Sequence, residues 1–397
     1  MRKGWEYKKL GEVCEVVTGT TPKTNIPEYW GKGHYWVTPA ELNDTTVYID
    51  KTERQITDEA LSKTKLRLLP VGTVLLSSRA PIGKVAIANA EMYCNQGFKN
   101  CICSEAIYNK YLFYFLRLKK DYLNSLGRGA TFKEISKSIV ESIKIPLPPK
   151  STQLAIVSEL DKINELIRLK KEQLKDFDNL AQSLFYEMFG DPVENEKGWE
   201  VKKLGEISSL ICNGNTPKGG SEVYVDNGIL FLRSQNVWKN RLDLDDVAFI
   251  DEATHKTLKK SALNHHDLLI TKTGRVNTEN SSLGRTALFE GEDGSANING
   301  HVYLVRLKEG MVHKYVLYIL ISNSYRELIR RTCVGGIDKR QLNKNHIEDF
   351  PIILPPLPLQ RLFAQRIEQI EREKSEVQKS IQDLETLLAS RMQYWFE

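Results

Sequence analysis

The chain repeats itself, and this repeat limits its possible folds more than any other feature. Residues 4–13 read GWEYKKLGEV, and residues 198–207 read GWEVKKLGEI, 194 positions later. Further pairs follow in the same order: Thr21-Pro22-Lys23 with Thr216-Pro217-Lys218, Trp36-Val37-Thr38 with Phe231-Leu232-Arg233, Leu75-Leu76-Ser77 with Leu269-Ile270-Thr271, Tyr111-Leu112-Phe113-Tyr114 with Tyr315-Val316-Leu317-Tyr318, and Ile145-Pro146-Leu147-Pro148-Pro149 with Ile352-Ile353-Leu354-Pro355-Pro356. Two copies of one unit, which differ by loop insertions, therefore fill the 397 residues.

Each copy consists of a mixed part and a long helix. The mixed parts, residues 1–149 and 191–356, have short apolar segments separated by Gly, Asn and Pro, which is typical of an α/β domain. The segments 150–190 and 357–397 each follow a proline cluster and are nearly free of Gly, which predicts long helices. Ser151 or Thr152 is a candidate N-cap of the first helix. We therefore expect an α+β fold, with two α/β domains separated by two long helices.

Apolar residues recur at alternating spacings of three and four along both helices, which predicts a coiled coil. About 38 residues form a rod of about 57 Å, which is too long to bury against one small domain. An antiparallel pair would relate the copies by a pseudo-twofold axis and bring Lys374 near Ala181. The predicted helix interface consists of Leu160, Ile163, Ile167, Leu174, Phe177, Leu184, Ile367, Ile370, Val377, Ile381, Leu384 and Leu388. Two unrelated amphipathic core helices remain the alternative.

The sequence carries no recognisable catalytic motif. There is no GxxxxGK[ST] phosphate loop and no Gly-rich cofactor loop with the NPP-aromatic motif of amino-methyltransferases. Glu6-Tyr7-Lys8 and Glu200-Val201-Lys202 have nuclease-like ExK spacing, but no acidic partner is placed upstream. His265-His266 beside Asp267 fits a loop before a strand better than a metal site. We therefore expect no catalytic site, metal or cofactor in this chain.

Composition adds a few limits. With 27% charged and 41% apolar residues, the chain fits a globular class rather than a disordered one. No apolar segment approaches the ~18–20 residues of a membrane span, and none follows Met1 as in a signal peptide, so we expect a cytoplasmic protein. The six cysteines include no CxxC pair, which indicates reduced thiols.

Basic and amide side chains in glycine-containing loops are candidate contacts for nucleic-acid phosphates and base edges. In the first copy the candidates are Lys23, Arg79, Lys84, Gln96, Lys99, Arg128, Thr131 and Lys133. In the second copy they are Lys218, Arg233, Gln235, Asn236, Lys272, Arg275, Asn299, Lys339 and Arg340. Each one alone is explained as well by an ordinary surface residue, so the prediction depends on the repeated constellation.

The net charge of +5 is unevenly distributed along the repeat. Residues 1–150 contain 23 basic and 15 acidic residues, whereas residues 191–356 contain 22 of each. The helical segments are slightly acidic, with 5 basic and 7 acidic residues in 151–190 and 6 and 7 in 357–397. We therefore expect the first domain to bind nucleic-acid phosphates more strongly than the second.

The motif order resembles the specificity subunit of type I restriction-modification systems. In the first copy the resemblance rests on GW-x-x-KKLGE, TGTTPKT, PEYWG, WVTPAEL, LLSSRAPIGKVAI, NQGFKN, GATFKEIS and IPLPP. In the second copy it rests on GNTPKGG, FLRSQNV, GGIDKRQL and ILPPLPLQRL, so it covers essentially the whole chain. The second copy lacks the SR-x-PIG and NQGF motifs and has LLITKTGRVNTENSSLG and NINGHVYL instead.

The resemblance implies a non-catalytic DNA-binding subunit with two target recognition domains, each reading half of a bipartite asymmetric site. It implies two modification (methyltransferase) subunits as partners, which use S-adenosylmethionine to methylate adenine N6, and restriction subunits that need ATP. We hypothesise that the helices set the distance between the half-sites, about one turn of DNA.

Three alternatives remain open at this point. The chain could be a self-contained methyltransferase or nuclease with duplicated recognition domains, which the missing motifs disfavour. It could be a coiled-coil adaptor without a DNA role. A stand-alone repressor is a weaker alternative because no helix-turn-helix signature is visible.

Overall fold

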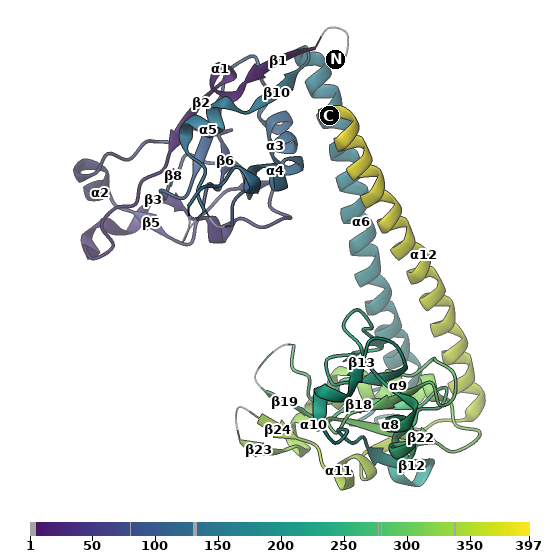
Figure 1. Ribbon diagram of the computed structural model, residues 1–397. Coiled ribbons are helices and arrows are strands. Elements are labelled where there is room, and N and C mark those ends of the chain that lie inside the picture. The colour runs from purple at the N-terminus through teal and green to yellow at the C-terminus, as the bar shows by residue number, and fades with distance from the viewer. Residues whose placement is uncertain (1–4, 80, 130–132, 277, 279, 337–338) are drawn as a thin grey trace. The chain divides into compact units, whose positions relative to one another are not determined.

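The structure is a computed structural model that describes residues 5–79, 81–129, 133–276, 278, 280–336 and 339–397. The chain divides into two compact units (Figure 1). Unit 1 contains residues 1–171 and 379–397, and unit 2 contains residues 172–378. The boundaries lie within the two long helices, so each unit has one α/β domain and a part of both helices.

Unit 1 is built on a five-stranded sheet of order β2-β9-β6-β7-β4, beside a three-stranded sheet of order β5-β3-β8 and the pair β1-β10. The elements are β1 (Glu6–Lys9), α1 (Leu10–Val13), β2 (Cys14–Thr18), η1 (Pro27–Tyr29), β3 (Trp30–Val37), η2 (Pro39–Glu41), β4 (Tyr48–Ile49), β5 (Gln55–Ile56), α2 (Asp58–Lys63), β6 (Val74–Leu76), β7 (Val85–Ala88), β8 (Tyr93–Cys94), β9 (Lys99–Cys103), α3 (Asn109–Leu118), α4 (Lys120–Ser125), α5 (Lys137–Ser142) and β10 (Lys144–Leu147). Helix α3 lies against β6 and β7 and buries Tyr111 through Leu116.

Unit 2 repeats this plan with a sheet of order β12-β22-β18-β20, a sheet of order β13-β17-β14-β21, the pair β11-β25 and the small sheet β19-β24-β23. Its elements are β11 (Glu200–Lys203), α7 (Leu204–Ile207), β12 (Ser208–Asn213), η3 (Gly220–Val223), β13 (Tyr224–Val225), β14 (Ile229–Leu232), β15 (Val237–Trp238), β16 (Arg241–Leu242), β17 (Ala248–Ile250), α8 (Glu252–Thr257), η4 (Lys259–Ser261), β18 (Leu268–Thr271), β19 (Thr273–Gly274), β20 (Thr286–Leu288), β21 (Ala296–Ile298), β22 (Val302–Leu307), α9 (His313–Ile321), α10 (Asn323–Thr332), β23 (Val334–Gly336), β24 (Lys339–Gln341), α11 (Lys344–Glu348) and β25 (Pro351–Leu354). The predicted internal repeat and mixed fold are therefore confirmed.

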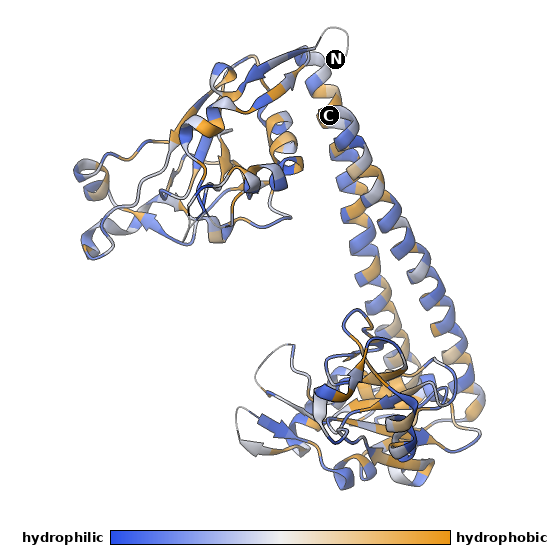
Figure 2. Ribbon diagram, in the orientation of Figure 1, coloured by the Kyte–Doolittle hydropathy of each residue, from blue (hydrophilic) through white to orange (hydrophobic). Residues whose placement is uncertain are grey.

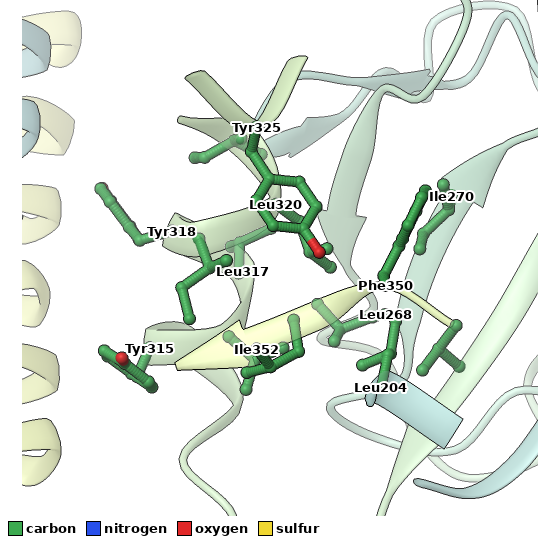
Figure 3. Close-up of a cluster of buried hydrophobic side chains, with 14 of the residues drawn as sticks. Leu204, Leu268, Ile270, Tyr315, Leu317, Tyr318, Leu320, Tyr325, Phe350 and Ile352 are labelled. Atoms are coloured by element: carbon green, nitrogen blue, oxygen red, sulfur yellow. The ribbon is translucent and has the colours of Figure 1, made fainter. Parts of the chain in front are cut away.

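The core of unit 2 lies between the β12-β22-β18-β20 sheet and the helices α9 and α10 (Figure 3). Figure 3 shows Tyr315, Leu317, Tyr318, Leu320 and Tyr325 from these helices with Leu268 and Ile270 from β18, Leu204 from α7, and Phe350 and Ile352 at β25. Nearly all of these side chains are fully buried. Each one stabilises the fold by about 1.5–3 kcal/mol relative to exposure.

The repeat extends to individual hydrogen bonds. The Tyr111 hydroxyl donates to the Pro146 carbonyl at 2.7 Å, and Tyr315 makes the equivalent bond to Ile353 at 2.8 Å. Gln153 donates to the Pro148 carbonyl at 2.9 Å, and Gln360 to Pro355 at 2.8 Å. The tyrosines tie α3 and α9 to the strand before a long helix, and the glutamines tie the start of that helix to the proline segment before it, so the two copies share one framework.

The two long helices, α6 (Lys150–Phe189) and α12 (Leu357–Phe396), lie antiparallel within each unit. In unit 1, Glu159 near the start of α6 pairs with Arg391 near the end of α12. In unit 2, Phe185 near the end of α6 packs on Phe363 near the start of α12, with ring centres 5.5 Å apart. The predicted antiparallel helix pair is therefore confirmed. Figure 2 shows polar residues along much of α12, with apolar residues more frequent on α6.

All predicted helix-interface residues are at least partly shielded from solvent. Seven are buried: Leu160, Ile163, Ile167, Ile367, Ile370, Val377 and Ile381. Five are half-buried: Leu174, Phe177, Leu184, Leu384 and Leu388. The last residues of the two helices pack into the domain cores as well as along the helix interface. Phe189 contributes to the core of unit 2, and Phe396 contributes to the core of unit 1.

Two details differ from the expectations. Helix α6 begins at Lys150, and the amides of Thr152 and Gln153 donate to the Pro149 carbonyl, so Ser151 and Thr152 lie inside the first turn rather than at the N-cap. Lys374 pairs with Asp178, one turn before Ala181, because a carboxylate neutralises a charge that a small residue would only accommodate.

The remaining sequence expectations concern cysteines and membrane spans. All six cysteines are free thiols, four of them buried. No helix among the described residues is long and apolar enough to cross a membrane.

Candidate nucleic-acid interface

In both units, the loops that follow the repeated strands meet at one edge. In unit 1, the amide of Asn95, after β8, donates to the Val37 carbonyl at the end of β3 at 3.2 Å, and Ser78, after β6, donates to Gly97 at 2.7 Å. Unit 2 repeats both bonds, with Asn299 to Leu232 at 3.0 Å and Lys272 to His301 at 2.8 Å. We call this surface the strand-end edge of each unit. It collects polar residues from distant parts of the chain on a rigid base.

A glycine makes this convergence possible in each copy. A Cβ on Gly19, after β2, would lie 1.8 Å from the Asn95 carbonyl oxygen, and a Cβ on Gly214, after β12, would lie 2.0 Å from that of Ile298. No side chain fits there, so only glycine lets the backbone segments approach.

The strand-end edge of unit 1 has a hollow lined by Arg79, Lys84 and Gln96, together with Pro39, Ala40, Pro81, Asn95 and Gly97. Lys84 donates to the Pro39 carbonyl at 3.0 Å, and Arg79 donates to Glu134 at 2.9 Å. The structure therefore brings three of the predicted contact residues together. Two cations and an amide in one hollow form a set of donors that suits phosphate oxygens and base acceptors.

Three chain segments that are joined by antiparallel bridges border the hollow. Glu134 forms backbone bridges with both Arg79 and Arg128, and the exposed Lys133 precedes it. In unit 2 the same place is the sheet β19-β24-β23. It carries Lys339 and Arg340 on β24, with Lys272 and Arg275 on either side of β19. Seven of the predicted cations, three in unit 1 and four in unit 2, thus gather on one repeated feature.

In unit 2, an aspartate orients two of the predicted residues. Arg233 donates to the Asp246 carbonyl at 2.7 Å, and Gln235 donates to the Asp246 carboxylate at 2.6 Å. Gln235 is exposed and Arg233 is half-buried. The Asn299 side chain accepts from the amide of His301 at 3.0 Å and holds the loop after β21.

Two of the predicted contact residues do not reach the surface. Lys99 is 5% exposed and Asn236 is 1% exposed. Lys99 donates to Glu134 at 3.0 Å, and Asn236 donates to the carbonyls of Asp243 and Asp246 at 2.9 and 2.8 Å. Both satisfy buried polar groups and shape the loops, so the expectation of direct DNA contact is corrected for these two residues.

The other predicted residues are distributed as follows. Nine are exposed: Lys23, Arg79, Gln96, Arg128, Lys133, Lys218, Gln235, Arg275 and Lys339. Five are half-buried: Lys84, Arg233, Lys272, Asn299 and Arg340. Thr131 lies outside the described residues. Lys23 and Lys218 occupy equivalent loops after β2 and β12.

The sequence reasoning missed Arg285. β7 and β20 pair with β6 and β18 in the same register, which aligns Gly83-Lys84 with Gly284-Arg285. Both glycines have positive φ, 89° and 67°. A glycine followed by a cation occurs in both copies and could have identified Arg285 from the sequence. An insertion before this pair in the second copy shifted it out of alignment with the first copy.

The charge network below the unit 1 hollow is anchored by Glu134. Burial opposes ionisation of this carboxyl, but hydrogen bonds from Lys99 and Arg79 outweigh burial and lower the pKa of Glu134. The carboxylate therefore stays ionised and holds the two cations in place.

The motifs considered for catalysis have structural partners. Glu6 and Lys8 pair on β1 at 3.1 Å, and Glu200 and Lys202 pair on β11 at 3.2 Å. Asp267, beside the two histidines, pairs with Arg306 at 2.7 Å. Among the residues that the structure describes, no group of three His, Cys, Asp or Glu side chains could hold a metal ion.

The repeat has a counterpart in known proteins. A family model described as the type I restriction modification DNA specificity domain matches residues 2–176 and again residues 196–386. The chain belongs to this family. It is a DNA-specificity subunit of the type I restriction-modification class, a recognition component and not an enzyme.

Relatives cover nearly the whole chain. The type I restriction enzyme MjaIX specificity subunit of Methanocaldococcus jannaschii is 32% identical, over 97% of this chain and 91% of the relative. The EcoKI specificity subunit of Escherichia coli is 22% identical, over 96% and 84%. The solved S subunit from M. genitalium has a TM-score of 0.53 at 14% identity and covers 99% of this chain and 96% of that one. A type I R-M system structure gives 0.64 at 21%, covering 99% and 97%.

Proposed function

We propose that each unit reads one half of a bipartite, asymmetric DNA site through its strand-end edge. The observation that carries this proposal is the repetition of one backbone framework with different side chains at its edge. Arg79, Lys84 and Gln96 line the edge in unit 1, whereas Arg233 and Gln235 do so in unit 2. Different donors on the same framework support different sequences for the two half-sites.

We further propose that the chain assembles with two modification (methyltransferase) subunits and with restriction subunits. S-adenosylmethionine and ATP would then be used by those partners. The match to the specificity-domain family over both halves of the chain supports this assembly, and we expect it to work in the cytoplasm.

Mapping methylated adenines in DNA from cells with and without the chain tests this function. The expected result is one split motif whose methylation disappears when the chain is absent. A hybrid that exchanges residues 14–103 for the equivalent segment of a relative should change only one half of the motif. Methylation that does not depend on the chain would contradict the proposal.

The paired helices are proposed to set the distance between the half-sites. One heptad inserted in each helix, between the levels of the Lys171–Glu385 and Lys374–Asp178 pairs, keeps the seam in register and adds about 10 Å. We expect a spacer about three base pairs longer with both half-sites unchanged. An unchanged spacer would refute this role of the helices.

A further inference from the structure

Four basic side chains gather around Trp238 in unit 2. Lys239 and Arg241 come from the β15–β16 hairpin, Arg285 precedes β20, and Arg326 lies in the first turns of α10. The Arg285 guanidinium lies 3.8 Å from the centre of the Trp238 ring, and that of Arg241 lies 5.4 Å from it. We call this group the Trp238 cluster.

Among the described residues, no carboxylate is hydrogen-bonded to or ion-paired with the cations of this cluster. Arg285 is 9% exposed and donates to the neutral carbonyls of Asn280 and Ser281. Among the described residues, Lys239, Arg241, Arg285 and Arg326 form no ion pair. The Trp238 indole N–H is buried without an acceptor. Within the described part of the chain, four cations and an indole N–H without an acceptor thus lie near one another without a paired carboxylate.

In unit 1, the cations at the equivalent position are neutralised by a carboxylate of the same chain. In the segment after β3, Asp44 accepts from Lys120 at 2.9 Å, and Arg117 donates to the Asp44 carbonyl. The equivalent segment of unit 2, after β14, carries Lys239 and Arg241 instead. The second copy has therefore replaced an internal counterion with further cations.

Such crowding costs free energy. Burial is the main cause that lowers the pKa of Lys239, Arg285 and Arg326, and repulsion from neighbouring guanidinium groups adds to it. Asp178 attracts Lys239, but it is already paired with Lys374. Glu327 attracts Arg326, but it is already paired with Arg330. A bound anion would relieve this repulsion, and guanidinium groups match phosphate oxygens in pairs.

We propose that the Trp238 cluster binds a backbone phosphate of DNA. Its position favours DNA over an acidic protein segment, because Arg285 holds the connection between β19 and β20. The other end of that connection joins the sheet that carries Lys339 and Arg340. Arg285 also occupies the position of Lys84, which lines the hollow of unit 1. The contact is independent of sequence and anchors the second α/β domain, since residues 191–356 contain 22 basic and 22 acidic residues.

The test is the salt dependence of DNA binding by the full-length chain. Loss of one phosphate contact lowers the slope of log K against log salt by about 0.9, which corresponds to about eightfold weaker binding at 0.1 M salt. We expect this effect for Arg241→Gln and for Arg326→Gln. Target and non-target duplexes should weaken equally, since a phosphate contact carries no sequence information.

Matched variants separate the alternatives. Arg241→Lys keeps a positive charge and should retain most of the slope. Lys256→Gln removes an exposed cation that is paired with Glu252 on α8, and should leave the slope unchanged. Urea unfolding of each variant identifies any general loss of structure.

Three results would overturn the proposal. The first is an unchanged slope in folded Arg241→Gln and Arg326→Gln. The second is an unchanged slope with weaker binding of a methyltransferase partner, which would assign the cluster to an acidic protein surface. The third is a wild-type chain that binds no DNA, which would contradict DNA recognition itself.

Discussion

The two units are alike where they are buried and different where they can meet DNA. Tyr111 and Tyr315 make the same hydrogen bond to the strand before a long helix. At the surface the copies diverge, because Asp44 neutralises Lys120 in unit 1 whereas no described carboxylate pairs with the Trp238 cluster of unit 2. The comparison teaches that net charge per domain is a poor measure of DNA-binding potential. A domain with equal numbers of acids and bases can still concentrate its cations in one place.

The largest expected effect comes from the helix ends that complete the two cores. Phe189→Ala and Phe396→Ala should each lower the free energy of unfolding by about 3–5 kcal/mol, because each leaves a cavity in a closely packed cluster. Phe189 should weaken unit 2 and Phe396 unit 1. Urea unfolding measures the loss of unfolding free energy, and hydrogen exchange shows which unit is weakened. Equal weakening of both units by one variant would contradict the division of the core.

The next effect concerns the charge network that Glu134 forms with Lys99 and Arg79 in unit 1. Glu134→Gln should cost about 1.5–3 kcal/mol at neutral pH, because Lys99 would remain buried without its carboxylate. Since folding lowers the pKa of Glu134, its contribution is complete above the ordinary value of 4.5 and disappears as pH falls through the lowered value. Urea unfolding at several pH values should show the wild-type advantage shrinking in acid. If the stability difference between wild type and Glu134→Gln did not change with pH, the proposed role of the Lys99–Glu134 ion pair would be contradicted.

The glycines test whether the strand-end edges are built alike. Gly19→Ala and Gly214→Ala should each cost about 1–3 kcal/mol and weaken DNA binding, because a Cβ would overlap a backbone carbonyl. Gly336→Ala on β23 is the matched control, since a Cβ there meets nothing within 4 Å. Thermal unfolding and DNA-binding assays compare the three. Tolerance of Ala at position 19 or 214 would refute the close approach.

Base reading should be separable between the units. Gln96→Ala should relax one base position in the first half-site, and Gln235→Ala one in the second, each by about 1–3 kcal/mol of discrimination. Methylation mapping of the variants identifies the positions. A variant that altered both half-sites would break the assignment of one edge to each half.

The smallest effect concerns the ion pairs between the helices. Glu385→Gln in unit 1 and Asp178→Asn in unit 2 should each cost less than about 1 kcal/mol, since their carboxylates are largely exposed. Asp178→Asn should cost more, because its partner Lys374 is the less exposed of the two lysines. Chemical unfolding at low and high salt checks both, and the differences should vanish at high salt.

The framework could be predicted from sequence because it is periodic and repeated. The long helices, their antiparallel pairing and the two domains follow from heptads and from matched segments. The contact surface could be predicted only in part. Lys99 and Asn236 have the composition of contact residues, yet burial decides their role and sequence does not show burial of single polar residues. Arg285 was missed because an insertion moved it out of alignment with Lys84.

The end of α12 packs in the core of unit 1, and this has a consequence for biosynthesis. The core of unit 1 contains Phe396, with Leu388, Met392 and Trp395 packed against it, and all four residues follow unit 2 in the chain. The first domain therefore leaves the ribosome with part of its apolar surface uncovered and completes its packing only after the second domain has been made. Unit 2, whose residues are contiguous, has no such delay. A stop codon between residues 378 and 388 would consequently damage the packing of unit 1, although its α/β domain precedes unit 2 in the chain.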